Sequence, residues 1–97
     1  MPTGTSAIED LEEVLRARLG AATAESYTAR LYADRELLVR KVMEEAFEVC
    51  LELGRTPVDR QATVAEAADL VYHVLAGLVQ EGISFDDVAA ELARRRR

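Results

Sequence analysis

The chain has 97 residues, enough for one domain, and its 49% hydrophobic and 31% charged residues exclude a disordered polymer. Twelve lysines and arginines against 18 acidic residues give a net charge of −6, which argues against a nucleic-acid partner. One cysteine and one histidine exclude an internal disulfide, a cysteine-rich zinc site and any two-histidine metal motif.

The chain is predicted to begin with a loose segment and a helix. Residues 1–6 lack the basic and apolar regions of a signal peptide, and we expect a flexible tail there. Ser6 and Glu9 have the spacing of a capping box, which predicts a helix over residues 7–19 that ends at Gly20. Because no uninterrupted apolar stretch approaches ~20 residues, we expect a cytoplasmic protein without a membrane partner.

A connection and a long helix are predicted next. Residues 20–30 show no sustained period, so we expect a connection with one helical turn near 29–32. Asp34 is a candidate cap for a helix over residues 35–53, and Gly54 is a natural end for it. The apolar stripe of this helix consists of Leu38, Val42, Ala46, Val49 and Leu53.

A second long helix is predicted to extend to Glu81, with Gly82 after it. Thr56 followed by Pro57 is a typical helix start, and a start near Thr63 is the alternative. The apolar stripe here consists of Val64, Ala68, Val71, Leu75 and Leu78.

A short final helix is predicted after Gly82. Ser84 and Asp87 have capping spacing, and Ile83 can pack against Val88 across the first turn. The residues expected to face inward are Val88, Leu92 and Ala89.

These elements predict an all-α bundle of four to five helices with the two long helices antiparallel at its centre, so that residues 7–97 form one domain. Both long helices are apolar on more than one face. The additional apolar residues are Val39, Met43, Phe47, Cys50, Leu70, Val74 and Val79. Four short helices can hardly cover this surface, so we expect a homodimer.

Acidic residues recur on the two long helices at spacings that place them on shared faces. Glu44, Glu45 and Glu48 lie on the first long helix, and Glu66 and Asp69 lie on the second. Antiparallel packing would bring the two groups together, and their repulsion requires a counter-ion. Mg²⁺ prefers carboxylate oxygens and keeps waters for substrate phosphates, with Mn²⁺ as a substitute.

A purely structural interpretation remains open for these acids, because glutamate is a good helix former and acidic runs often cover solvated faces. This interpretation is preferred for Glu36, Glu52 and Glu81. The five clustered acids differ from them because they adjoin apolar positions such as Phe47 and Ala67.

Four blocks of sequence carry a resemblance to a known family. They occupy residues 26–31 (Ser-Tyr-Thr-Ala-Arg-Leu), 40–49 (Arg-Lys-Val-Met-Glu-Glu-Ala-Phe-Glu-Val), 67–73 (Ala-Ala-Asp-Leu-Val-Tyr-His) and 82–88 (Gly-Ile-Ser-Phe-Asp-Asp-Val). Over about residues 8–95 the chain resembles the phosphoribosyl-ATP pyrophosphohydrolases of histidine biosynthesis, in the all-α MazG-like superfamily. The departures are arginine for lysine at Arg30 and Arg40, and methionine for glycine at Met43, which could alter packing or narrow access to the acids.

The resemblance implies Mg²⁺-dependent hydrolysis of the α–β phosphoanhydride of phosphoribosyl-ATP, giving phosphoribosyl-AMP and pyrophosphate. The implied metal ligands are Glu45, Glu48, Glu66 and Asp69. Glu44 is implied as a further ligand or as the base that orients water, beside the catalytic Glu45 and Glu48.

The resemblance also implies a set of substrate contacts. Lys41 and, less directly, Arg40 are placed to meet a phosphate. The hydroxyls and cation of the first block suit phosphate or ribose, which implicates Ser26, Tyr27, Thr28 and Arg30. His73 is open to a structural or a catalytic interpretation, and Cys50 is interpreted as a small core residue.

Two other functions compete with this one. The same chemistry could serve a house-cleaning enzyme that hydrolyses dNTPs or modified nucleotides. Alternatively, the chain could be a non-catalytic dimeric helical module whose acids are surface residues without affinity for Mg²⁺.

Overall fold

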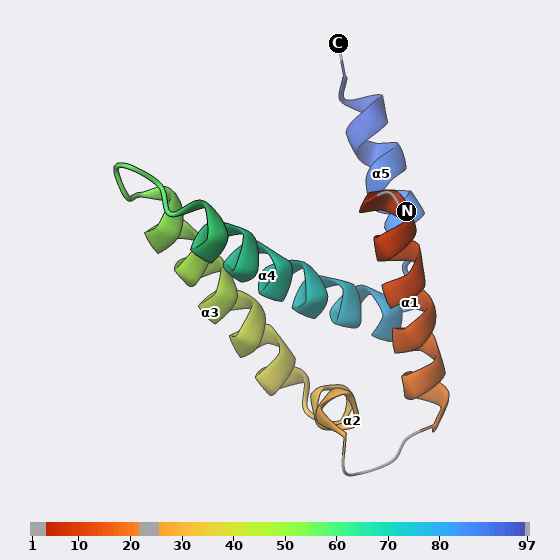
Figure 1. Cartoon of the computed structure of the whole chain (residues 1–97). Helices are drawn as coiled ribbons and strands as arrows, with labels where there is room; N and C mark the ends of the chain where they lie inside the picture. Colours follow the sequence, from red (N-terminus) through yellow and green to blue (C-terminus); the bar gives the residue numbers. More distant parts are fainter. Residues whose placement is uncertain (1–3, 22–25, 97) are drawn as a thin grey trace.

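The structure, a computed structural model, describes residues 4–21 and 26–96, and these ranges contain five α-helices and no strand (Figure 1). The helices are α1 (Gly4–Ala21), α2 (Tyr27–Ala33), α3 (Arg35–Leu53), α4 (Arg60–Gln80) and α5 (Phe85–Arg94). The predicted all-α class is therefore confirmed. Residues 1–3 of the predicted tail and residues 22–25 of the predicted connection lie outside the described residues.

The two long helices α3 and α4 form an antiparallel pair at the centre of the fold, as predicted (Figure 1). Helix α2 lies beside the start of α3, and α1 crosses the C-terminal end of α4 next to α5. Gly77 allows the central pair to approach closely, because a Cβ atom there would lie 3.2 Å from Cδ2 of Leu38.

Side-chain caps explain where four of the helices begin. The carboxylate of Asp34 accepts a hydrogen bond from the amide of Leu37, and Ser84 accepts one from the amide of Asp86. Both caps were predicted, as was the end of α3 at Gly54. Gly82 adopts φ = 71°, a left-handed conformation that favours glycine, after the end of α4.

Three predicted boundaries are wrong. Helix α1 starts at Gly4 and continues past Gly20, so Ser6 lies inside the helix and cannot be its N-cap. Helix α4 starts at Arg60 because Asp59 accepts the amide of Ala62 at 3.0 Å, which makes Asp59 the cap in place of Thr56.

The alternative start of α4 at Thr63 is wrong as well. The connection predicted over residues 20–30 is also wrong in its extent, because α2 begins inside it. The hydroxyl of Thr63 donates to the backbone oxygen of Asp59 at 2.7 Å, so it does not cap the following residues. Helix α2 already begins at Tyr27, because Ser26 caps it through the amide of Ala29.

Among the side chains that the structure describes, the buried apolar core is small. It consists of Leu15, Leu31, Leu38, Leu75, Ala76 and Val79. Large apolar residues are exposed along both central helices, among them Val39, Met43, Phe47, Leu51, Val64, Val71 and Val74. Three burial predictions fail in the single chain: Leu92 is 60% exposed and Ala89 is exposed on a helix without buried residues, and Cys50 is exposed.

A buried carboxylate connects the first helix to the last. Glu12 of α1 is 4% exposed, and its Oε2 accepts a hydrogen bond of 2.7 Å from the amide of Phe85. This amide belongs to the first turn of α5, where no earlier carbonyl can serve it. The position of α5 therefore depends on a side chain more than seventy residues away.

Helix α4 is long and apolar enough, by length and composition, to cross a membrane. The core helix of a soluble protein passes the same test, and α4 packs against α3 and α1 while carrying two acids, Glu66 and Asp69. The composition of α4 fits the role of a central helix.

Candidate active site

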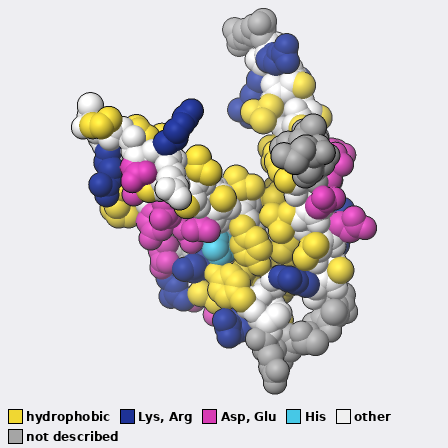
Figure 2. Space-filling model, viewed as in Figure 1, with side chains coloured by type: hydrophobic (Ala, Val, Ile, Leu, Met, Phe, Trp, Pro, Cys, Tyr) yellow, Lys and Arg dark blue, Asp and Glu magenta, His cyan; other side chains and the backbone are white. Residues whose placement is uncertain are grey.

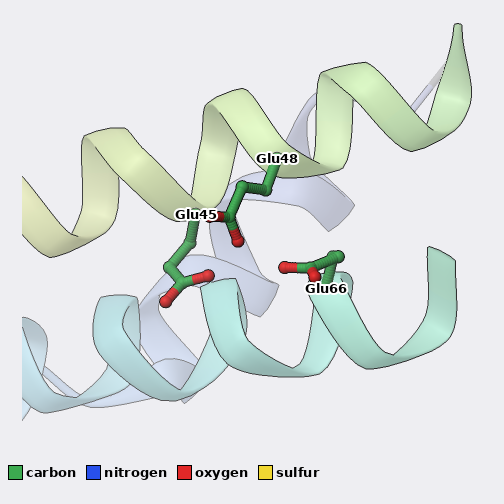
Figure 3. A group of neighbouring side chains, drawn as sticks. All are labelled: Glu45, Glu48 and Glu66. Atoms are coloured by element: carbon green, nitrogen blue, oxygen red, sulfur yellow. The ribbon is translucent and has the colours of Figure 1, made fainter. Parts of the chain in front are cut away.

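Three of the predicted carboxylates converge between the central helices. Glu45 and Glu48 come from successive turns of α3, and Glu66 comes from the facing turn of α4 (Figure 3). One oxygen from each carboxylate lies within 4.8 Å of the others. We call these three residues the acidic cluster.

Within the described ranges, some carboxylate oxygens of the acidic cluster are buried without a hydrogen-bond partner. Glu45 is 8% exposed, and among the described residues its Oε2 and the Oε2 of Glu66 are buried without a hydrogen-bond partner. Buried polar atoms are almost always paired, so two orphaned carboxylate oxygens in a group of three make the acidic cluster a candidate cation site.

The electrostatics of the acidic cluster point the same way. A hydrogen bond with Glu48, burial, and the charges of Glu48, Asp69 and Glu45 raise the pKa of Glu66 to about 7. Burial and the charges of Asp69 and Glu48 raise the pKa of Glu45, against weaker lowering by His73 and Lys41. Without a cation, the acidic cluster therefore retains a proton near neutral pH.

Asp69 and Glu44 lie at the margin of the acidic cluster. Asp69 is exposed and does not belong to the group within 4.8 Å, although its charge acts on both Glu45 and Glu66. Glu44 is also exposed, and its Oε2 lies 3.3 Å from Nζ of Lys41, which donates to it. The predicted phosphate contact Lys41 thus has an acidic partner in the free protein.

Arg40 and Met43 line a groove that does not include the acidic cluster. The same groove is lined by Arg35, Glu36 and Val39 on the apolar flank of α3. Met43 is 66% exposed there, so the structure gives no sign that it narrows access to the acidic cluster.

The space-filling view shows how charge is distributed on one face of the molecule. Acidic side chains gather over α3 and α4 beside the single histidine, and basic side chains border them (Figure 2). These acids thus lie next to cations that could meet a phosphate group.

The start of α2 places two hydroxyls against α4. The hydroxyl of Tyr27 lies 2.7 Å from Nε2 of His73, and Oγ1 of Thr28 lies 2.9 Å from the hydroxyl of Tyr72. Thr28 is 1% exposed and also accepts a hydrogen bond from Arg18. The Thr28 hydroxyl, predicted to meet substrate, is therefore occupied within the fold.

The other two predicted contacts in this segment differ from each other. The hydroxyl of Ser26 accepts the amide of Ala29 as the cap of α2. The guanidinium of Arg30 is exposed and lies 5.7 Å from the centre of the Tyr27 ring, a cation–π arrangement. Arg30 remains available to a ligand.

Comparison with known proteins decides the family. The family model described as phosphoribosyl-ATP pyrophosphohydrolase matches residues 8–96. The chain belongs to the phosphoribosyl-ATP pyrophosphohydrolase family.

Two named relatives share most of their length with this member of the phosphoribosyl-ATP pyrophosphohydrolase family, and a third shares less than half of its own. A phosphoribosyl-ATP pyrophosphatase of Pyrobaculum islandicum is 45% identical over 93% of this chain and 95% of its own. That of Rhodospirillum rubrum is 43% identical over 97% of this chain and 80% of its own. The histidine biosynthesis bifunctional protein HisIE of Vibrio vulnificus is 41% identical over 93% of this chain and 42% of its own.

One contact of this family member was missed by sequence reasoning. Nδ1 of His73 lies 2.9 Å from the backbone oxygen of Asp69 and 3.8 Å from Oε1 of Glu45. The four-residue spacing places His73 one helical turn after Asp69, but every residue offers a backbone oxygen, so the sequence carried no specific signal for this contact.

Proposed function

We propose that the chain hydrolyses the α–β phosphoanhydride of phosphoribosyl-ATP, releasing phosphoribosyl-AMP and pyrophosphate in the second step of histidine biosynthesis. The family match over residues 8–96 supports the reaction. The observation that carries it within the molecule is the acidic cluster, because three converging carboxylates next to cations suit a metal-dependent reaction on a polyphosphate.

We further propose that the acidic cluster binds Mg²⁺, with Mn²⁺ as a substitute, and that Asp69 assists from its margin. The donor set fits the ion, since it consists of carboxylate oxygens, two of which are buried and unpartnered among the described residues. When bound, such an ion would neutralise phosphate charge and lower the pKa of a water molecule.

The paired Lys41 and Glu44 fit the remaining chemistry. A substrate phosphate that binds Lys41 would compete with its hydrogen bond to Glu44. The released Glu44 carboxylate would then accept the proton of the attacking water, as the water oxygen bonds to phosphorus and the anhydride P–O bond breaks. Arg30, exposed on α2 over the ring of Tyr27, would meet further phosphate charge.

We propose that the working form is a homodimer in the cytoplasm. The radius of gyration is 14.7 Å, whereas a compact domain of this length has about 12.5 Å. The accessible surface is 7151 Å², about 1,600 Å² more than a compact monomer of this mass exposes. The exposed apolar residues of α3 and α4 would supply the interface that removes this excess.

Release of pyrophosphate from phosphoribosyl-ATP, measured with Mg²⁺ and with a chelator, tests the function. We expect Mg²⁺-dependent release by the wild-type protein and loss of it in Glu48→Gln, with Glu36→Gln as a matched control on the same helix. A dNTP panel is assayed in parallel. Faster turnover of any dNTP than of phosphoribosyl-ATP would contradict the proposed substrate.

A further inference from the structure

His73 connects the acidic cluster to the start of α2 through both of its ring nitrogens. Nδ1 faces the backbone oxygen of Asp69 at 2.9 Å and Oε1 of Glu45 at 3.8 Å. Nε2 faces the hydroxyl of Tyr27 at 2.7 Å. The residue is only 6% exposed, so these partners and not solvent determine the arrangement of its hydrogen atoms.

The partners of His73 define one tautomer of the neutral ring. A backbone carbonyl oxygen can only accept a hydrogen bond, so Nδ1 carries the hydrogen and donates it to Asp69. Nε2 then has a lone pair, and the Tyr27 hydroxyl must donate to it. The hydroxyl hydrogen of Tyr27 is therefore used inside the protein and cannot be offered to a phosphate.

Few side chains of α2 are buried. Helix α2 has seven residues, and only Thr28 and Leu31 are buried. The rings of Tyr27 and Tyr72 both pack edge-on against His73, with centroids 5.8 and 5.2 Å from it. The bond from Tyr27 to His73 and the neighbouring pair of Thr28 and Tyr72 thus connect the start of α2 to α4, while the side chain of Gln80 donates to the backbone oxygen of Tyr32 near the other end of α2.

We propose that His73 is a positioning residue that, through the Tyr27 hydroxyl, holds the start of α2 and the cation Arg30 against the acidic cluster. Arg30 lies over the ring that His73 fixes, so the orientation of that ring determines where the guanidinium meets substrate phosphates. This inference rests on the proposed function, but the His73–Tyr27 bond itself can be tested without substrate.

The first test uses the fact that the chain contains one histidine. In untagged, ¹⁵N-labelled protein at pH 8.5, long-range ¹H–¹⁵N correlation reports the two imidazole nitrogens of His73 alone. We expect hydrogen on Nδ1 and a free lone pair on Nε2. Tyr27→Phe should shift the Nε2 resonance, and Tyr32→Phe, which removes a hydroxyl from the same helix, should not. Hydrogen on Nε2, or no response to Tyr27→Phe, would overturn the proposal.

The second test separates positioning from independent contributions to catalysis. Tyr27→Phe and His73→Leu should each lower kcat/KM about tenfold, because small displacements of a binding group are costly. The double variant should lose no more of its kcat/KM than the more impaired of the two single variants. His73→Gln, which restores a hydrogen-bond acceptor, should recover part of the loss. Losses that multiply in the double variant would contradict action through Tyr27.

These results remain interpretable if a variant is unstable or the substrate assignment is wrong. Tyr27→Phe removes one oxygen atom and leaves His73 in place, so it tests the proposal even where His73→Leu does not fold. A wild-type protein without activity on phosphoribosyl-ATP would refute the proposed function alone, while the imidazole spectrum still decides the bond. An active wild-type protein matched by an equally active Tyr27→Phe would refute the positioning role alone.

Discussion

Glu66 shows how one side chain couples the stability of the fold to pH. Its pKa is raised to about 7, so the folded protein holds a proton that the unfolded chain releases near pH 4.5. The stabilisation from this proton is complete below pH 4.5 and is lost as the pH rises through 7. In the metal-free protein, repulsion within the acidic cluster therefore increases over this range.

Glu66→Gln mimics the protonated side chain and should remove this dependence. With a chelator present, the stability advantage of Glu66→Gln over wild type should increase from pH 5 to pH 8, as measured by urea unfolding. Glu36→Gln controls for the loss of one negative charge from the long helices. If the stability advantage of Glu66→Gln stays constant or shrinks with rising pH, Glu66 is not the carboxylate that holds the proton.

The margin of the acidic cluster should contribute less to metal affinity than its centre. Glu48→Gln should weaken Mg²⁺ binding by about tenfold or more, and Asp69→Asn by a smaller factor, because Asp69 lies outside the group whose oxygens converge within 4.8 Å. Calorimetric titration of each variant with Mg²⁺ measures the difference. Equal losses would place Asp69 among the direct ligands.

At the scale of elements, α5 depends on a partner outside its own segment. Glu12→Ala would leave the amide of Phe85 without its acceptor, and we expect a loss of about 2 kcal/mol in unfolding free energy. The exposed neighbour Glu13→Ala serves as the control in denaturant unfolding. Similar losses for both variants would mean that the bond to α5 contributes little.

The same scale shows what sequence reasoning can reach. The period of Leu38, Val42 and Val49, together with the cap Asp34, located α3 to the residue. The start of α4 was missed because Thr56 and Asp59 both precede apolar periodicity, and only the fold shows which one reaches a free amide. When two candidate N-caps lie within four residues of each other, sequence spacing alone cannot decide which one begins the helix.

The site was predictable to a similar extent and for related reasons. The convergence of Glu45, Glu48 and Glu66 follows from helical spacing, which is a local pattern, and from the antiparallel packing expected of two long helices joined by a short turn. The roles of Thr28 and His73 depend on contacts between residues more than forty positions apart. No periodicity in one helix could reveal these contacts.

At the scale of the whole molecule, the exposed apolar surface should determine the oligomeric state. Val39, Met43, Val74 and Leu78 line one groove between α3 and α4, which we call the outer groove. If a second copy covers the outer groove, charge placed there must be desolvated on association and will oppose it.

Met43→Glu should therefore shift the protein from dimer to monomer in light scattering at micromolar concentration. Val58→Glu, an exposed apolar position in the turn between α3 and α4, is the matched control. A wild-type monomer, or a dimer that is insensitive to Met43→Glu, would contradict pairing through the outer groove.

The antiparallel pairing of α3 and α4 also bears on the order of folding. Only 17 residues separate Glu48 from Glu66, so the acidic cluster assembles by closing a short loop. The junction of α1 with α5 instead joins residues 73 positions apart. In native-state hydrogen exchange, we expect the amides of α5 to exchange through local unfolding. This local unfolding should cost less free energy than the unfolding that exposes the amides of α3 and α4. The helices that carry the acids would then stay paired while the ends of the chain open and close.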